Sequence, residues 1–124
     1  MPRRETSTIN TSTGAQEIKE LLTQGVEDIH VRESLEKKLR SGKPLRIKHG
    51  LDPTGEKIHL GRAATLWKVR EFQDLGHKVI LIVGDYTAQI GDPYDKLSKR
   101  PFLSAQQVQK NMTRYKEQIG KIID

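Results

Sequence analysis

The chain contains no cysteine, few aromatic residues and no long apolar run. The absence of cysteine excludes disulfides and thiolate metal sites, and it fits a reducing compartment. His30 and His49 have no partners at metal-ligand spacing, so the sequence predicts no zinc site. The longest apolar run, Val79 to Val83, is far too short to span a bilayer, and no secretion signal is recognisable. We therefore expect a cytoplasmic protein that is not embedded in a membrane.

The composition predicts one domain with a modest core and a basic surface. The chain has 124 residues, of which 34% are hydrophobic, and a formal net charge of +6. This charge would favour encounters with polyanions such as RNA or nucleotide phosphates. The alternative is a solvated surface, because the basic residues are interleaved with glutamate, as in residues 33–40.

The first third of the chain predicts a tail followed by helices. Residues 1–13 are polar and bury too little apolar surface to offset the entropy of ordering, so we expect a disordered polar tail. Residues 14–44 carry two short helical patterns. The first spans residues 15–24 and stops at Gly25, and the second spans residues 31–40 and stops at a Gly/Pro loop.

Residues 45–124 predict the beginning of a parallel α/β domain. Alternation over residues 45–48 predicts a strand, and apolar residues every three or four positions over residues 61–75 predict a helix packed on a sheet. The continuous apolar run within residues 78–84 predicts a second strand, buried on both faces. This order is a βαβ unit, in which ligands bind beyond the carboxyl ends of the strands.

Two loops follow these strands and should meet at one ligand. The turn at residues 50–62 follows the first strand, and residues 85–102 predict a long loop after the second. Ser104 predicts the start of a final helix, with Gln107 in the capping-box position.

The segment KHGLDPTGEKIHLGRAAT at residues 48–65 predicts an anion site. It delivers His59 and Arg62 to a helix start, where unpaired N–H groups and the helix dipole attract negative charge. Positions three apart share a helix face, so we expect both side chains to flank one ligand, with Gly61 allowing close approach. The alternative for His59 is a capping or surface histidine.

Several segments resemble class I aminoacyl-tRNA synthetases, and tyrosyl-tRNA synthetases in particular. HLGR at 59–62 is similar to the HIGH signature of that class, and GLDPT at 50–54 is similar to the turn before it in the tyrosyl enzymes. The other matching segments are EKKLRSGKPLRIK at 36–48, FQDLGHK at 72–78, GDYTAQIGDP at 84–93, KR at 99–100 followed by PFLS, and YKEQIGKIID at 115–124. The resemblance covers about residues 15–124. It implies the N-terminal portion of a Rossmann-like parallel sheet, the HUP-type nucleotide-binding fold, preceded by two short helices.

The resemblance implies a tyrosyl-tRNA synthetase activity, with this chain as a truncated or minimal form. In that family ATP activates tyrosine to tyrosyl-adenylate, and the tyrosyl group is then transferred to tRNA. The tyrosine carboxylate itself attacks the α-phosphate, so the protein supplies positive charge, together with Mg²⁺, rather than a nucleophile. The implied ligands are ATP, Mg²⁺, tyrosine and tRNA.

The resemblance also implies roles for individual residues. The implied ATP-binding residues are Gly50, Asp52, Thr54, His59, Gly61, Arg62 and Thr65. The implied catalytic residues are Thr54, His59, Arg62, Lys96 and Arg100, of which the last two would grip pyrophosphate. The implied tyrosine-binding residues are Lys48 and Asp92. Within these sets Thr54 and His59 would contact the γ-phosphate and Thr65 would approach the ribose.

Three positions depart from the family's pattern. Arg62 stands where the family has the second histidine of HIGH, and it is longer and permanently charged. Asp95 places a negative charge beside Lys96, and Lys48 occupies a place where many members have tyrosine. The family's second signature, KMSKS, is absent, because KLSKR at 96–100 fits the pyrophosphate loop instead.

Two alternatives to an active synthetase follow from these departures and from the motif. One is a non-catalytic remnant that binds ATP or tRNA. The other is a small nucleotidyltransferase with the same helix-start motif and a different acceptor. In each case two parallel strands leave unpaired edges, so we expect a homodimer or a complementing C-terminal half to cover them.

Overall fold

The computed structural model describes residues 14–90 and 102–124. Its elements are α1 (Ala15–Leu21), α2 (Arg32–Arg40), β1 (Arg46–Leu51), α3 (Leu60–Asp74), β2 (Lys78–Val83), α4 (Tyr86–Ile90) and α5 (Ala105–Ile119). Within these two ranges no helix has the length and apolar character needed to cross a membrane. The predicted tail and the positions Asp92, Asp95, Lys96 and Arg100 lie outside the described residues.

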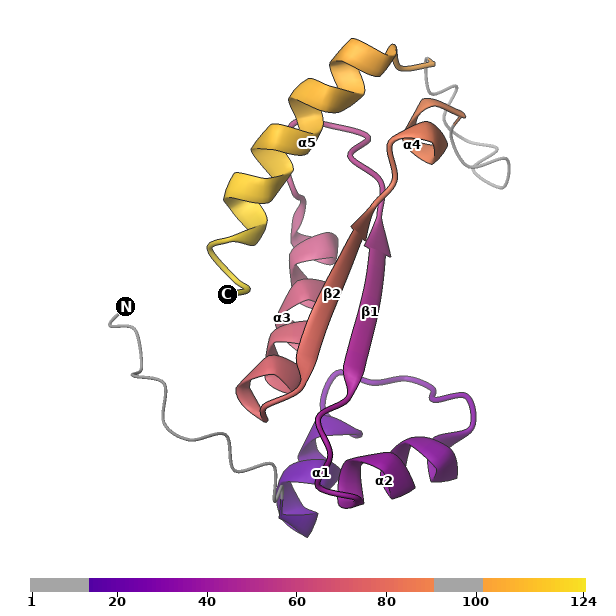
Figure 1. Ribbon diagram of the computed structural model, residues 1–124, viewed down its shortest axis with the longest axis vertical. Helices are drawn as coiled ribbons and strands as arrows, with labels where there is room; N and C mark the ends of the chain where they lie inside the picture. The colour runs from indigo at the N-terminus through magenta and orange to yellow at the C-terminus, as the bar shows by residue number, and fades with distance from the viewer. Residues whose placement is uncertain (1–13, 91–101) are drawn as a thin grey trace.

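At the centre of the fold β1 and β2 lie side by side, with α3 as the connection between them (Figure 1). The strands pair in parallel, in a register that runs from Arg46 opposite Lys78 to Leu51 opposite Val83. Both strands therefore end at the same edge of the sheet. This arrangement confirms the predicted βαβ unit and the Rossmann-like class of the fold.

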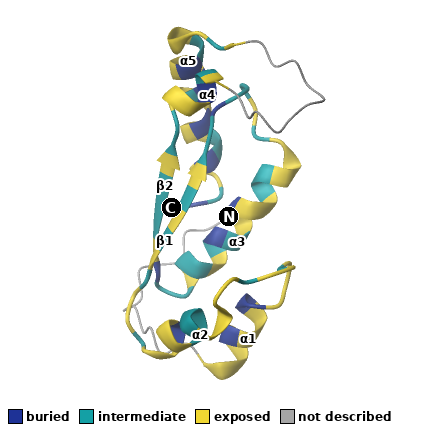
Figure 2. Ribbon diagram, turned by 90° about the vertical axis from the view of Figure 1, so that its right-hand side faces the viewer, coloured by how far each residue is buried: buried dark blue, intermediate teal, exposed yellow. Residues whose placement is uncertain are grey.

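The main core lies between one face of the sheet and the helices α3 and α5. Alternate strand residues face it, among them Leu51 of β1 and Leu81 of β2, because successive side chains of a strand point to opposite faces. The buried residues of this cluster are Leu66, Val69, Tyr115, Ile119 and Ile123. Figure 2 shows buried positions along α3 and α5. The core thus fixes α5 against the βαβ unit.

A second, smaller core lies where α1 and α2 meet the start of β1 and the end of α3. Its buried members are Ile18, Leu21, Leu22 and Leu39, and Leu45, Phe72 and Leu75 pack against them. Both helices lie beside the amino ends of the strands, at the opposite end from α4 (Figure 1). This confirms the expectation of two short helices before the sheet.

The ends of the helices follow the glycine signals with small shifts. Gly76 has a φ of 88° and ends α3 as predicted, since glycine adopts this left-handed conformation without a steric penalty. The helix α1 ends at Leu21, three residues before the predicted end. Val31 precedes α2 with a φ of 55°, which is unusual for a β-branched residue, so that helix starts at Arg32.

The prediction that the second strand is buried on both faces is wrong. Ile82 of β2 is 53% exposed, and Lys78 is also exposed. The described residues form a sheet of only two strands, and its helices pack on the face that carries Leu81. The apolar run therefore has one covered face and one open face.

Two other predictions need correction. The first strand extends to Leu51 rather than Lys48, because its pairing with β2 continues to the turn. The predicted loop at residues 85–102 contains α4 in its described part. Ser104 caps α5 as expected, with its hydroxyl accepting from the Gln107 N–H at 3.2 Å, but the Gln107 side chain donates to Asn111 instead of closing the capping box.

Candidate active site

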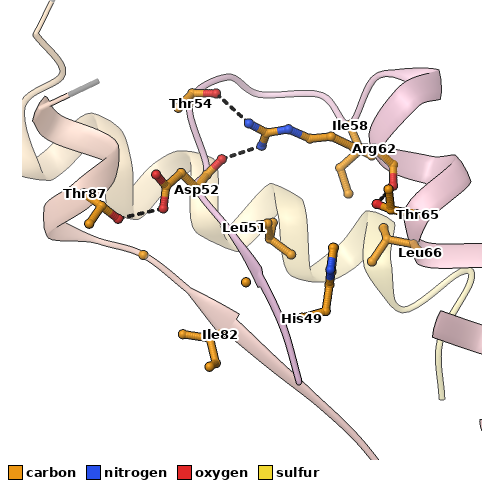
Figure 3. A pocket seen from close by; sticks show the side chains of 12 residues that line it. His49, Leu51, Asp52, Thr54, Ile58, Arg62, Thr65, Leu66, Ile82 and Thr87 are labelled. Carbon is orange, nitrogen blue, oxygen red and sulfur yellow. Dashed lines mark hydrogen bonds between the residues drawn. The ribbon is translucent and has the colours of Figure 1, made fainter. Parts of the chain in front are cut away.

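A cavity of about 440 Å³ lies beyond the carboxyl ends of β1 and β2, where the sequence predicts a ligand (Figure 3). Polar side chains come from β1, from the turn after it, from the start of α3 and from the segment after β2, and apolar ones come from the strands, the turn and α3. The lining residues are His49, Gly50, Leu51, Asp52, Thr54, Ile58, Arg62, Thr65, Leu66, Ile82, Gly84 and Thr87.

Arg62 supplies the positive charge of this cavity. From the first turn of α3 its side chain reaches back to the turn after β1 (Figure 3). Its Nη1 donates to the Asp52 backbone oxygen and, at 3.0 Å, to the Tyr115 hydroxyl, and its Nη2 donates to Thr54 Oγ1 at 3.2 Å. All these acceptors are neutral. Among the described residues no carboxylate forms an ion pair with Arg62, so an anion in the cavity would be its counter-ion.

Asp52 and Thr87 join the two loops that border the cavity. The Thr87 hydroxyl of α4 donates to Asp52 Oδ1 at 2.7 Å. Gly84 lies against this pair, and a Cβ atom at that position would come within 2.2 Å of both Asp52 Oδ1 and Thr87 Oγ1. The close approach therefore requires glycine. It confirms that the segments after the two strands converge, as their topology predicts.

His59 lies at the N-cap of α3 and is exposed. Its Nδ1 accepts a hydrogen bond from the Arg62 backbone N–H at 3.3 Å. The imidazole thereby takes up one of the N–H groups that a helix start offers to an anion. His59 does not line the cavity, and its position is that of the capping histidine considered as the alternative.

The helix α5 holds the turn between β1 and α3 in place. Asn111 is buried and donates through Nδ2 to the Pro53 carbonyl at 3.0 Å. Gln118 makes two bonds at 2.9 Å, accepting from the Ile58 N–H and donating to the Glu56 carbonyl. Buried backbone polar groups need such partners, so this turn depends on α5 for its conformation.

Sequence reasoning missed seven residues of the cavity lining, which are the apolar Leu51, Ile58, Leu66 and Ile82 together with His49, Gly84 and Thr87. Burial lowers the pKa of His49, so its imidazole stays neutral at neutral pH. A neutral imidazole can donate one hydrogen bond and accept another without adding charge to the cavity. The signal for His49 is its place on the same face of β1 as Leu51, two residues away. Gly84 and Thr87 follow β2 directly, where a parallel sheet places its ligand contacts.

The structure brings together many of the predicted ATP-binding residues. Those that line the cavity are Gly50, Asp52, Thr54, Arg62 and Thr65. His59 and Gly61 do not line it, and neither does Lys48, which is predicted to bind tyrosine. Asp92, Lys96 and Arg100 lie outside the described residues. The described part of the chain holds no group of three or more His, Asp or Glu side chains able to bind a metal ion.

The comparisons with known proteins identify the family of the chain. Residues 40–124 match the family model described as tRNA synthetases class I (W and Y). The chain is 52% identical to the tyrosine–tRNA ligase of Dehalococcoides mccartyi over 107 residues, which are 86% of this chain and 27% of that protein. It is 50% identical to the enzyme of that name from Carboxydothermus hydrogenoformans over 109 residues, covering 85% of this chain and 26% of the relative.

A third relative extends the match slightly. The tyrosine–tRNA ligase of Aromatoleum aromaticum is 47% identical over 112 residues, or 90% of this chain and 28% of that protein. The chain thus spans little more than a quarter of the length of the curated relatives it matches. The matched region contains both strands, α3 and the whole cavity, and on these grounds the chain belongs to the class I tRNA synthetase family of the tryptophan and tyrosine enzymes.

Proposed function

We propose that this chain carries the ATP-binding part of a tyrosyl-tRNA synthetase, which activates tyrosine to tyrosyl-adenylate and transfers it to tRNA. The observation that carries this proposal is the half-buried guanidinium of Arg62, which has only neutral partners and lines the cavity at the strand ends. Arginine pairs well with phosphate oxygens, so a nucleotide phosphate is a fitting counter-ion. The relatives named tyrosine–tRNA ligase support tyrosine and tRNA as the other substrates.

Within this proposal each polar group has a defined task. Arg62 and Thr54 bind phosphate oxygens, and His59 both caps α3 and meets the γ-phosphate through its other nitrogen. Gly50 and Asp52 border the nucleotide, Gly61 keeps the helix start open, and Thr65 approaches the ribose. The remaining roles are proposed for residues outside the cavity lining or outside the described ranges: tyrosine binding by Lys48 and Asp92, and pyrophosphate binding by Lys96 and Arg100.

The reaction needs charge stabilisation more than bond-making by the protein. The tyrosine carboxylate attacks the α-phosphate and pyrophosphate leaves, so cations at the phosphates lower the barrier. Asp52 contributes one carboxylate to the cavity, which fits a Mg²⁺ ion that is held mainly by nucleotide oxygens. When bound with ATP, that ion would neutralise phosphate charge. Charging of tRNA would place the protein in the cytoplasm.

The proposal is tested by tyrosine-dependent exchange of labelled pyrophosphate into ATP. We expect exchange with tyrosine and not with other amino acids, and we expect Arg62→Ala to weaken ATP binding by about tenfold or more, since hydrogen bonds to a charged group are strong. Arg40→Ala removes the same charge from the exposed surface of α2 and should leave exchange unchanged. If the original chain exchanges pyrophosphate no faster than a His59→Ala variant, a catalytic role for the chain is excluded.

A second candidate is a module that binds ATP without catalysing adenylate formation. It is favoured by the contacts of Arg62 with Asp52, Thr54 and Tyr115, which fix the cation using described residues alone. Calorimetric binding of ATP without pyrophosphate exchange would select this candidate over the first.

We also propose that another protein segment covers the open edges of the sheet. In the described residues β1 and β2 pair only with each other, and Ile82 is 53% exposed. A second copy of this chain or a complementing C-terminal half could supply the cover. Sedimentation of the purified chain distinguishes the two, because only the first gives a dimer without added protein.

A further inference from the structure

One stripe of α5 carries the side chains that reach the turn before α3. Asn111, Tyr115 and Gln118 are spaced by four and three residues, so they lie on the same helix face. Asn111 and Gln118 bind backbone groups of the turn. Tyr115 differs from both, because its hydroxyl accepts from the Arg62 guanidinium.

The contact between Tyr115 and Arg62 has two components. The hydroxyl accepts from Nη1 at 3.0 Å, and Arg62 Cζ lies 5.7 Å from the centroid of the tyrosine ring, within the range of a cation–π interaction. Tyr115 is only 1% exposed and packs with Leu66 and Ile119 in the main core. Its ring is therefore fixed, whereas a long arginine side chain has many rotamers of its own.

The bonds to the turn leave part of the guanidinium for a ligand. Nη1 donates to Asp52 and Tyr115, and Nη2 donates once, to Thr54. Nε and the second N–H of Nη2 form no hydrogen bond to the residues that the structure describes. Both are charged donors of the kind that pairs with phosphate oxygens.

We propose that Tyr115 is a positioning residue that fixes the Arg62 guanidinium against the turn, so that its remaining donors are set in advance for nucleotide phosphate. The identity of the ligand in this inference rests on the proposed function. The fixing of Arg62 by Tyr115 does not depend on it. The hydroxyl carries the effect. A phenylalanine would fill the same core space but could not accept the hydrogen bond.

The first test measures the mobility of Arg62 in the chain without ligand. The NMR signal of the Arg62 Nε–H group is assigned by its loss in Arg62→Lys. In the original protein this group should have a high order parameter. In Tyr115→Phe the order parameter should fall below roughly 0.6, the range of a flexible group. Tyr86→Phe is the matched control, because it makes the same chemical change at a side chain that is 69% exposed. An unchanged Arg62 signal in Tyr115→Phe overturns the proposal whether or not ATP binds.

The second test measures how strongly phosphates contribute to binding. Calorimetry with ATP, tripolyphosphate and adenosine should show that Tyr115→Phe weakens the two phosphate ligands by about fivefold and leaves adenosine unchanged. The same substitution in an Arg62→Ala background should have no further effect, because the two residues act as one unit. Equal losses for ATP and adenosine, or a loss that persists without Arg62, would reduce Tyr115 to a structural residue and overturn the proposal.

The two tests separate this inference from the proposed function. If the original protein binds neither ATP nor tripolyphosphate, the proposed function fails. The Arg62 signal in Tyr115→Phe then still decides whether Tyr115 fixes the guanidinium.

Discussion

At Gly84 the turn after β1 and the helix α4 approach too closely for any side chain. We predict that Gly84→Ala separates Asp52 from Thr87, since the new methyl group would lie 2.2 Å from an oxygen of each. The free energy of unfolding should fall by about 1 to 3 kcal/mol, the usual cost of overpacking. ATP binding should weaken as well, because Asp52 lines the cavity. Urea denaturation and calorimetric titration measure the two effects.

The chain offers a matched control for this substitution. Gly55 lies in the turn after β1, where an added methyl group would meet no atom within 4 Å and the backbone is not left-handed. Gly55→Ala should therefore change the free energy of unfolding by less than about 0.5 kcal/mol. Equal effects at both glycines would show that the contact at Gly84 is unimportant.

His59 has one role that the structure shows and one that we propose, and two substitutions separate them. His59→Ala removes the acceptor for the Arg62 N–H, so the free energy of unfolding should fall by about 0.5 to 2 kcal/mol. His59→Asn supplies another capping oxygen and should restore most of that stability. Thermal or urea unfolding of both variants checks this order.

Catalysis should respond differently from stability at this residue. If His59 meets the γ-phosphate, His59→Asn recovers the fold but not the pyrophosphate exchange of the original chain. Recovery of exchange together with stability would show that capping is the only role of the imidazole, and the γ-phosphate contact would have to be abandoned.

At the scale of elements, α5 acts as a brace for the turn that leads into α3. We predict that Gln118→Leu destabilises the fold by about 1 to 3 kcal/mol, because the Ile58 N–H and the Glu56 carbonyl both lose their partner. Amide hydrogen exchange at Ile58 should accelerate more than exchange within β1. Gln109→Leu is the control, since Gln109 is exposed on the same helix and its side chain makes no hydrogen bond to the described residues. A similar loss in both variants would argue against a brace.

The helices and strands themselves were largely predictable from local patterns. Gly76 marks the end of α3 through its backbone conformation, and the alternation from Leu45 onward marks β1. The sequence places the end of β1 too early, at Lys48, because Gly50 and Leu51 continue the pairing with a strand about 30 residues away. The exposure of Ile82 was also missed, because a run of apolar residues does not reveal how many strands a sheet has.

The site was less predictable than the elements that carry it. The position of Asp52 and Thr54 beyond a strand follows from the order of the βαβ unit. The link between Arg62 and Tyr115 joins residues 53 positions apart and depends on how α5 packs, so spacing within the motif could not show it. Spacing also could not show that Arg62 and His59 separate. The Arg62 side chain lines the cavity, whereas the His59 side chain caps α3.

At the scale of the whole molecule, the second, smaller core lies where the end of α3 approaches the start of β1. Phe72 and Leu75 of the α3 region pack on the cluster formed by α1 and α2, and His77 follows them at the junction with β2. The His77 Nδ1 accepts from the Leu45 N–H at 3.1 Å, and its ring lies 6.0 Å from that of Phe72. A buried imidazole therefore ties the second, smaller core to the sheet.

This contact should make the stability of the fold depend on pH. Burial lowers the pKa of His77 below its ordinary value of 6.5, so the unfolded chain takes up a proton more readily than the folded one. Stability is then fully present above about pH 6.5 and is lost as the pH falls through the folded pKa, with a slope of up to about 1.4 kcal/mol per pH unit. His49, whose pKa is also lowered by burial, acts in the same direction.

We predict that His77→Asn flattens this dependence, because an asparagine oxygen can still accept from the Leu45 N–H but takes up no proton in this range. Protonation of His77 would put a hydrogen on Nδ1, where it would oppose the Leu45 donor, and Nε2 already lacks a partner among the described residues. Urea denaturation between pH 7.5 and 5, with pH values set by buffers of about equal ionic strength, measures the slope. His30→Asn, at an exposed position in the loop before α2, should keep the slope of the original chain. A slope that His77→Asn leaves unchanged would mean that charging the imidazole does not weaken the contact between His77 and Leu45. The acid sensitivity would then have to be sought at His49.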